Sequence, residues 1–352
     1  MKKILLIASI VVGALMAKAA DDRHSVTIGN DHLANITAVV KTSPTTVIIR
    51  SDGRLMQVEV KALSKPFLNA WNISTEEKSA AENGGTAPSG SNYDFQPGRN
   101  HMTILSSDVT LDLVWIPPGT FTMGSPRSEV GSEGDHQEWE GPQTVVTISK
   151  GFWLGKTLVT QKQYKAVTGH KPGDQGHFVG EDFTNIGPNA PMEAVSWDDA
   201  MAFCQKLTDQ ERAAGHLPED LIFTLPTEAQ WEYACRAGTT GARYGNLDYI
   251  AWYAGNSGNT THPVARKQPN AWGLYDMLGN VFEWCSDWYY IRHPGGKVTD
   301  PVGPLGGDDH VIRGGSWLTP ADDCRSAYRD IGHGGWGRYN FIGFRLALVP
   351  TR

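Results

Sequence analysis

The chain has 352 residues, enough for roughly two domains of ordinary size. Its formal net charge of -7 excludes the basic surface typical of nucleic-acid-binding proteins, so we expect no nucleic-acid partner. The 39 glycines, 20 prolines and 12 tryptophans predict a loop-rich globule that is ordered by aromatic packing and not by long helices.

The N-terminus has the pattern of an export signal. Two lysines precede a short apolar run, and residues 17–19 (Ala-Lys-Ala) form a small-x-small cleavage pattern. The run is short for a bilayer span, although a retained N-terminal anchor is the alternative. We therefore expect residues 1–19 to be a signal peptide. The remaining chain would be exported to the periplasm or the extracellular space as a soluble protein without a membrane span.

Residues 26–71 predict a small all-β module. β-Branched runs at residues 36–40 and 47–50 are followed by an Asp-Gly turn signal. Residues 51–64 resemble the short SH3-like modules related to the Sla1 homology domain. A three-stranded meander without a special function is the alternative interpretation.

Composition changes twice along the rest of the chain. Residues 72–105 are rich in polar residues, Gly and Pro, which predicts a disordered linker. Residues 110–350 indicate a second, larger domain. Within it, residues 113–125 are typical of two strands joined by a Pro-Gly turn, and residues 144–158 of another strand pair around a glycine.

The sequence predicts two helices in the larger domain. Ser196 is typical of a helix N-cap and is followed by two aspartates in the first turn. Thr227 and Gln230 form a capping-box pattern at the start of the second helix, and Gly238 is placed to end it. The apolar face expected for the first helix consists of Ala200, Phe203, Cys204 and Leu207.

Cysteine usage leaves two alternatives open. The four cysteines are Cys204, Cys235, Cys285 and Cys324. An exported location permits disulfides, and four cysteines allow three complete pairings. Buried free thiols are the other interpretation. None of the spacings is CxxC, which argues against a zinc knuckle or a redox dithiol.

A series of long motifs carries a family resemblance. They are residues 115–125 (WIPPGTFTMGS), 191–200 (PMEAVSWDDA), 225–239 (LPTEAQWEYACRAGT), 270–288 (NAWGLYDMLGNVFEWCSDW), 313–317 (RGGSW) and 342–345 (IGFR). In this order they resemble the formylglycine-generating enzyme, or sulfatase-modifying factor, family over about 240 residues. The resemblance implies an α+β, loop-rich fold of the C-type-lectin kind, here preceded by the small SH3-like unit.

The resemblance implies a calcium site. The ligands implied by position are the side chains of Asp276 and Glu283 and the main-chain carbonyls of Gly279 and Val281. Ca²⁺ takes hard oxygen ligands of this kind. The alternative interpretation is that the two acids only cap turns. A possible second calcium loop would fall near Asn256 and Gly258, where the sequence is short and carries no carboxylate.

The resemblance also implies a copper site, which this chain carries only in part. In the family, two cysteines three and eight residues past the serine of the Arg-Gly-Gly-Ser turn hold Cu(I), which activates O₂. Here the serine is Ser316, the second position is Cys324, and the first position is Thr319. A hydroxyl cannot replace a thiolate at a soft Cu(I) ion. Cys285 is the alternative partner for Cys324, if it lies within reach.

These observations leave two function hypotheses. The first is an exported, calcium-stabilised binding or accessory protein without oxidase activity. Its partner would be a peptide, protein or glycan, with a sulfatase as one candidate. This partner would bind on an aromatic face formed by Trp317, Tyr328, Trp336 and Tyr339. The alternative is an active oxidase, with Ser316 and Cys324 as catalytic residues, that converts a sulfatase cysteine to formylglycine. A hydrolase built on Ser316 lacks a visible histidine partner.

Overall fold

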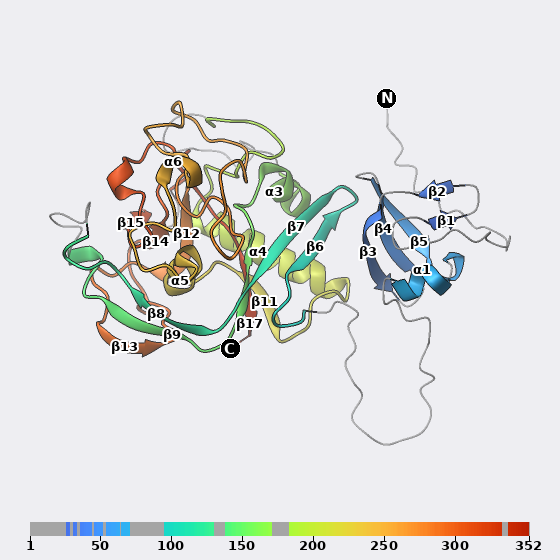
Figure 1. Ribbon diagram of the computed structural model, residues 1–352, viewed down its shortest axis with the longest axis horizontal. Helices are drawn as coiled ribbons and strands as arrows, with labels where there is room; N and C mark the ends of the chain where they lie inside the picture. Colours follow the sequence, from blue (N-terminus) through green and yellow to red (C-terminus); the bar gives the residue numbers. More distant parts are fainter. Residues whose placement is uncertain are drawn as a thin grey trace, which may run out of the picture. The chain divides into compact units, whose positions relative to one another are not determined.

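The computed structural model describes ten stretches of the chain, and they fall into two compact units (Figure 1). The described residues are 26–28, 31–33, 36–43, 46–51, 54–63, 65–70, 95–129, 138–170, 183–332 and 337–351. The predicted signal peptide and residues 72–94 of the predicted linker lie outside them. No helix in these stretches is both long and apolar enough to cross a membrane.

The first unit is built on an antiparallel meander. Its elements are β1 (Val26–Ile28), β2 (Asp31–Leu33), β3 (Ile36–Ser43), β4 (Thr46–Ser51), β5 (Arg54–Glu59), η1 (Val60–Ala62) and α1 (Lys65–Ala70). β3, β4 and β5 form the meander, and Ser51 of β4 pairs with Arg54 of β5 on either side of the predicted turn. Strands were predicted here, whereas the short helix α1 was not. The SH3-like assignment stays a prediction.

A five-stranded antiparallel sheet organises one half of the second unit. In spatial order it contains β11 (Leu221–Thr224), β17 (Ala347–Pro350), β10 (Phe152–Gly155), β7 (Val109–Ile116) and β6 (His101–Ser106). β6 corrects the predicted linker, because residues 101–105 are ordered by pairing with β7. Thr103 of β6 is buried against the domain, so the larger domain begins before residue 110.

Two smaller sheets complete the second unit. One contains β15 (Arg329–Gly332), β14 (His310–Arg313), β12 (Phe282–Trp288) and β16 (Ile342–Gly343), and the other contains β13 (Gly296–Thr299), β9 (Thr144–Ile148) and β8 (Gly119–Met123). The four predicted strands are confirmed as β7, β8, β9 and β10, but the pairing expected around Gly151 is wrong, since β9 and β10 join different sheets. β7 and β8, on either side of the Pro-Gly turn, also join different sheets. A Cβ on Gly151 would lie 2.2 Å from Trp115, so the chain passes close to that ring.

Both predicted helices are confirmed, with a small shift at one end. α4 (Trp197–Ala213) carries a capping box between Ser196 and Asp199, and α5 (Glu228–Arg236) carries one between Thr227 and Gln230. At the end of α5 the left-handed C-cap is Ala237, one residue before the predicted Gly238.

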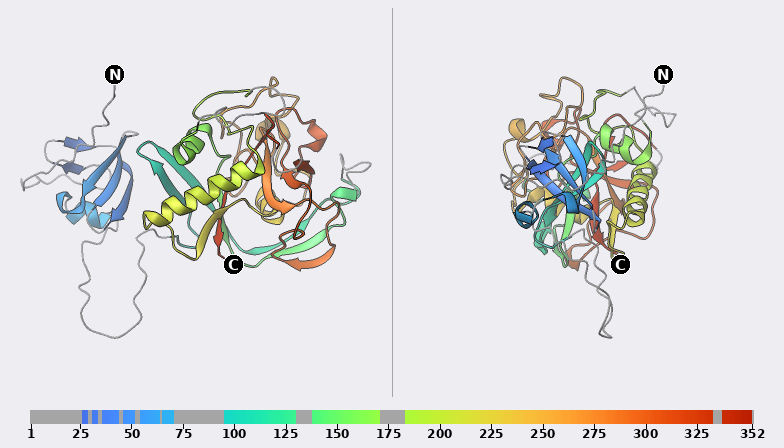
Figure 2. Two further views of the ribbon diagram at one scale, coloured as in Figure 1. Left: turned by 180° about the vertical axis from the view of Figure 1, so that it is seen from behind. Right: turned by 90° about the vertical axis from the view of Figure 1, so that its right-hand side faces the viewer.

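The helix α3 (Gln161–Thr168) was not predicted, although its signals are present in the sequence. Thr160 and Gln163 form a capping box, and Gly169 ends the helix with a φ of 83°. The remaining short elements are α6 (Leu247–Ile250) and η2 (Ala321–Asp323). α3 packs on α4 and on β7, while α4 packs on β11, so the two helices cover one face of the five-stranded sheet (Figure 2).

All four cysteines are buried free thiols, which decides between the two alternatives. Cys204 and Cys235 lie on the buried faces of α4 and α5, and Cys285 lies on β12. Burial raises the pKa of each thiol, because the charged thiolate loses its hydration in an apolar core. The core therefore holds them as small, unreactive hydrophobic side chains.

Candidate functional site

The predicted calcium loop is a tight, buried turn. Asp276, Gly279 and Asn280 have left-handed φ angles of 53°, 75° and 66°. A Cβ on Gly279 would lie 2.3 Å from the carbonyl oxygen of Trp252, so only glycine allows the loop to approach that stretch so closely. Val281 is also buried, at 1% exposure. The loop thus brings all the predicted ligand positions into the interior of the domain.

An arginine occupies part of this loop. Both carboxylate oxygens of Glu283 accept hydrogen bonds from Arg345, at 2.6 Å from Nε and 2.8 Å from Nη2. The Asp276 carboxylate accepts one from the backbone N–H of Ala265 at 2.7 Å. Burial raises the pKa of both acids. When both acids are ionised, the single guanidinium of Arg345 compensates one charge, and a cation held partly by carbonyl oxygens would compensate the other.

Side-chain donors alone would not hold a metal here. Within the described stretches, no cluster of three or more histidine, cysteine, aspartate or glutamate side chains is arranged for a metal ion. In the possible second loop, the Asn256 amide bonds to the backbone of Tyr253 and Ala251 at 3.0 and 3.1 Å. Gly258 has a φ of 66°. The Asn256 side chain therefore closes its own turn.

The turn that starts at Arg313 brings the two predicted copper positions together. A Cβ on Gly315 would lie 2.9 Å from the sulfur of Cys324 and 3.4 Å from Cγ2 of Thr319. Thr319 Oγ1 accepts a hydrogen bond from the backbone N–H of Ser316 at 2.9 Å and lies 3.0 Å from its hydroxyl. All three side chains are buried. The hydroxyl of Thr319 therefore stabilises the turn by accepting this hydrogen bond.

The predicted aromatic face is wrong in one member. Tyr328 is only 7% exposed and belongs to the hydrophobic core, because its ring packs between sheet and helix residues. Trp317 is half-buried, and its indole N–H donates to the carbonyl of Asn340 at 3.1 Å. Tyr339 is half-buried too, while Trp336 lies outside the described residues. A ligand could reach Trp317 and Tyr339, but not Tyr328.

A buried chain of ion pairs links α5 to the strands β14 and β15. Arg313 contacts Glu228 at 3.0 Å and also pairs with Glu232. Glu228 receives two hydrogen bonds of 2.7 Å from Arg329, and Arg236 donates to Glu232 at 2.8 Å. The sequence contained only a weak signal for this network, namely the acids and the arginine spaced four residues apart on α5.

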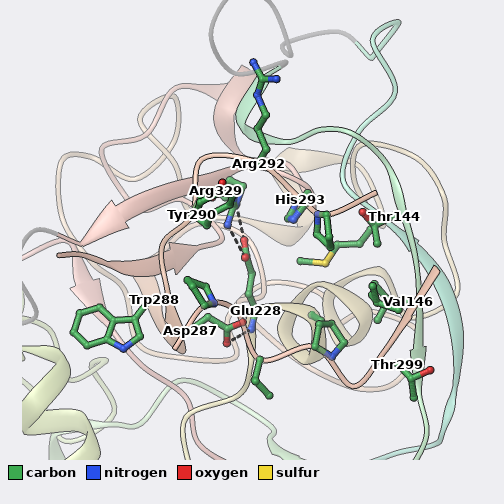
Figure 3. Close-up of a pocket in the computed structure, with 18 residues that line it drawn as sticks. Thr144, Val146, Glu228, Asp287, Trp288, Tyr290, Arg292, His293, Thr299 and Arg329 are labelled. Atoms are coloured by element: carbon green, nitrogen blue, oxygen red, sulfur yellow. Dashed lines mark hydrogen bonds and ion pairs between the residues drawn. The ribbon is translucent and has the colours of Figure 1, made fainter. Parts of the chain in front are cut away.

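Beside this network lies a cavity of ≈ 490 Å³ (Figure 3). It is bounded by the sheet of β8, β9 and β13, by the N-terminal turn of α5, and by the loops that follow β12 and β13. Asp287 and His293 line it and are 4% and 6% exposed. Burial, together with the charge of Glu228, raises the pKa of Asp287 to about 7. Burial, together with the charge of Arg329, lowers that of His293 to about 4.

Comparison with known proteins agrees with this geometry. The sulfatase-modifying factor enzyme 1-like domain matches residues 105–349. The chain belongs to this family. Bovine formylglycine-generating enzyme is 33% identical over 303 residues, which cover 68% of this chain and 75% of that protein. Chaperone protein LppX of Paenibacillus barcinonensis is 29% identical over 270 residues, which cover 63% and 84%.

A solved structure supports the same assignment. Treponema denticola variable protein 1 is 32% identical, with a TM-score of 0.59, and the match covers 71% of this chain and 99% of that one. The predicted α+β, loop-rich fold of this family is therefore confirmed. Because one similar protein is named an enzyme and another a chaperone, family membership alone leaves the activity open.

The residues at the family's copper position do not fit copper. Burial raises the pKa of Cys324 to about 12, so its thiol is protonated at neutral pH. The Thr319 hydroxyl is engaged with Ser316. Cys285 is buried on β12 as a free thiol. A Cu(I) site of this kind needs two sulfur ligands, and position 319 supplies a hydroxyl in place of one of them.

Proposed function

We propose that this member of the sulfatase-modifying factor family is an exported binding or accessory protein with a calcium-stabilised scaffold and no oxidase activity. One observation carries the proposal. The hydroxyl of Thr319 stands beside Cys324 where the copper pair needs a second sulfur, and it is hydrogen-bonded to Ser316. A hard, protonated oxygen is a poor ligand for the soft Cu(I) ion, so the turn lacks a ligand that copper-dependent oxidation requires.

Calcium would act as a structural ion in this proposal. The ion would be held by the side chains of Asp276 and Glu283 and by the carbonyls of Gly279 and Val281. Its charge would compensate the second carboxylate, because Arg345 compensates only one. Without it, one carboxylate charge stays buried with only hydrogen-bond compensation. The predicted second loop at Asn256 and Gly258 lacks a carboxylate and would be the weaker site.

The proposed partner is a peptide, a protein or a glycan, and a sulfatase is one candidate. Trp317 and Tyr339 are half-buried, so each can present part of a ring to such a ligand. The similarity to a protein named as a chaperone supports an accessory role. The similarity to a formylglycine-generating enzyme supports a sulfatase as the protein partner.

An active formylglycine-generating oxidase is the second candidate. The 33% identity with the bovine enzyme favours it, and so does the position of Cys324 beside residue 319. Such an enzyme would require Cu(I), O₂ and a sulfatase peptide that contains cysteine. Cys324 would also need a second sulfur ligand, since position 319 carries a hydroxyl.

An aldehyde assay distinguishes the two candidates. The full-length protein is incubated with a cysteine-containing sulfatase peptide, Cu(I) and O₂, and formylglycine is measured by mass spectrometry. We expect no aldehyde from the wild-type chain. Thr319→Cys restores two sulfurs around Gly315 and should gain Cu(I) binding that the wild type lacks. Wild-type aldehyde formation that disappears in Cys324→Ala, but not in Cys204→Ala, would overturn the proposal.

The predicted export signal has its own test. Expression of the full chain in a bacterial host with a secretion system, followed by N-terminal sequencing, should give a mature protein that starts at residue 20. A protein that keeps Met1 and remains with the membrane would instead support the retained anchor. Neither result depends on the oxidase assay.

A further inference from the structure

We propose that the cavity beside α5 binds a small organic ammonium ion with an apolar body, anchored on the carboxylate of Asp287. None of the residues that line the cavity belongs to the Ser316–Cys324 turn. The inference therefore adds a ligand class to the binding function proposed above, and it can fail or succeed independently of the copper question.

The anchor is a carboxylate with one oxygen left for a ligand. Asp287 Oδ2 accepts hydrogen bonds from the backbone N–H of Glu228 at 2.9 Å and from the Ser286 hydroxyl at 3.2 Å. No hydrogen bond within the described part of the chain engages Oδ1. That oxygen lies on the side of Gly303, another residue of the cavity wall, at 3.1 Å from where a Cβ would stand. No donor from the described residues engages this oxygen, so it can accept a hydrogen bond from an N–H group of a ligand in the cavity.

The other charged groups around the cavity are already paired with protein. Arg329 donates to both oxygens of Glu228 and to two backbone carbonyls. Glu228 is held between Arg329 and Arg313. At the exposed rim, Arg292 pairs with Glu138 at 2.7 Å. Since these guanidinium groups are engaged, the polar group offered to a ligand is an acceptor, which favours a cation over an anion.

The neutral state of His293 also favours a positively charged ligand. This side chain is 6% exposed, and its Nε2 has no hydrogen-bond partner among the described residues. Burial lowers its pKa to about 4, so the ring carries no positive charge at neutral pH. An ammonium ion can therefore enter the cavity without electrostatic repulsion from the imidazole.

The rest of the wall suits an apolar body. Met123 from β8, Val146 from β9 and Val298 from β13 contribute apolar side chains to the cavity wall. Trp288 also lines the cavity, while its ring stacks on His310 with the ring centroids 3.8 Å apart. A volume of ≈ 490 Å³ is within the usual range of pockets for small organic molecules. The wall thus combines apolar contact area with one carboxyl anchor, whose pKa of about 7 leaves it partly ionised at neutral pH. A bound ammonium ion would lower that pKa and favour the ionised form.

Three probes of nearly the same shape test the proposal by calorimetry on the full-length protein. They are 2-phenylethylammonium, the neutral 2-phenylethanol and the anionic phenylacetate. We expect the ammonium ion to bind about tenfold or more tightly than the alcohol, and phenylacetate to bind most weakly. Asp287→Asn keeps an oxygen for the Glu228 N–H but removes the charge, so it should bring the first two affinities together.

The matched control is Asp209→Asn, which removes an exposed acid on α4 outside the cavity wall and should preserve the preference for ammonium. Equal or tighter binding of phenylacetate by the wild type would overturn the proposal, as would the absence of millimolar binding by any probe. The comparison of the three probes needs only the wild-type chain, so it holds even if Asp287→Asn fails to fold. Aldehyde formation in the oxidase assay would contradict the proposed function without affecting this test.

Discussion

The two ends of the turn from Arg313 to Cys324 have different chemical roles. At one end, Arg313 is fully buried between Glu228 and Glu232. At the other end, Thr319 and Cys324 carry no charge and are held by a hydroxyl contact and by apolar packing. The ion pairs of Arg313 and the hydrogen bond of Thr319 stabilise this turn, so the turn does not need a thiol at position 319 for its shape.

The largest effect should come from breaking the charged end. Arg313→Met leaves the carboxylates of Glu228 and Glu232 with less compensation in the interior, and we expect the free energy of unfolding to fall by about 3–5 kcal/mol. Urea unfolding followed by circular dichroism measures it. The control Arg292→Met removes an exposed pair with Glu138 and should cost at most about 1 kcal/mol. Similar small losses of unfolding free energy in both variants would contradict the stabilising role of the buried Arg313 ion pairs.

Calcium should give the next largest effect, since its predicted loop also belongs to the scaffold. EDTA should lower the melting temperature of the wild type, because an ion at about 100 times its Kd adds about 2.7 kcal/mol to the stability of the folded state. Asp276→Ala removes the carboxylate ligand and should abolish the EDTA effect. We prefer this variant to Glu283→Ala, which would also leave Arg345 without its partner. An unchanged wild-type melting curve in EDTA would refute the site.

The cavity next to the charged network should show two opposing pH effects. The pKa of Asp287 is raised to about 7, so the folded state retains a proton that the unfolded state has lost, and this contribution to stability falls as pH rises from about 4 to 7. The pKa of His293 is lowered to about 4, so its contribution falls as pH drops from about 6.5 to 4.

Single variants separate these two contributions. Between pH 4 and 7, the stability of Asp287→Asn should rise with pH more steeply than that of the wild type, by up to about 1.4 kcal/mol per pH unit. His293→Phe should change the slope in the opposite direction. Denaturant titrations at a series of pH values measure both slopes. Parallel curves for all three proteins would contradict the burial of these groups.

The smallest effect should come from the uncharged end of the turn. Thr319→Val keeps the shape of the side chain but leaves the Ser316 N–H without its acceptor, and we expect a loss of about 1 kcal/mol. Thr319→Ser retains the hydroxyl and should lose less. Urea unfolding measures the two variants side by side. A loss as large as that of Arg313→Met would show that the two ends of the turn do not differ.

The sequence predicted those parts of the fold that depend on local signals. Ser196 and Thr227 mark their helices because capping satisfies N–H groups within one turn of the chain. The same type of signal at Thr160 was present and was overlooked. Strand partners were predicted wrongly around Gly151, because nothing local to a strand specifies which sheet it joins. Tyr328 was placed on the surface, since a single aromatic residue does not reveal its burial.

By itself, the sequence determined the family, the positions of two helices and the absence of a thiolate at Thr319, because these depend on residue identity and short-range spacing. Only the tertiary structure decided that Arg345 shares Glu283 with the predicted calcium loop, and that Arg313, Glu228 and Arg329 form one buried network. It also placed Asp287 and His293 in one cavity. The physical reason is that ion pairing and desolvation act between side chains that are close in space, whatever their separation along the chain.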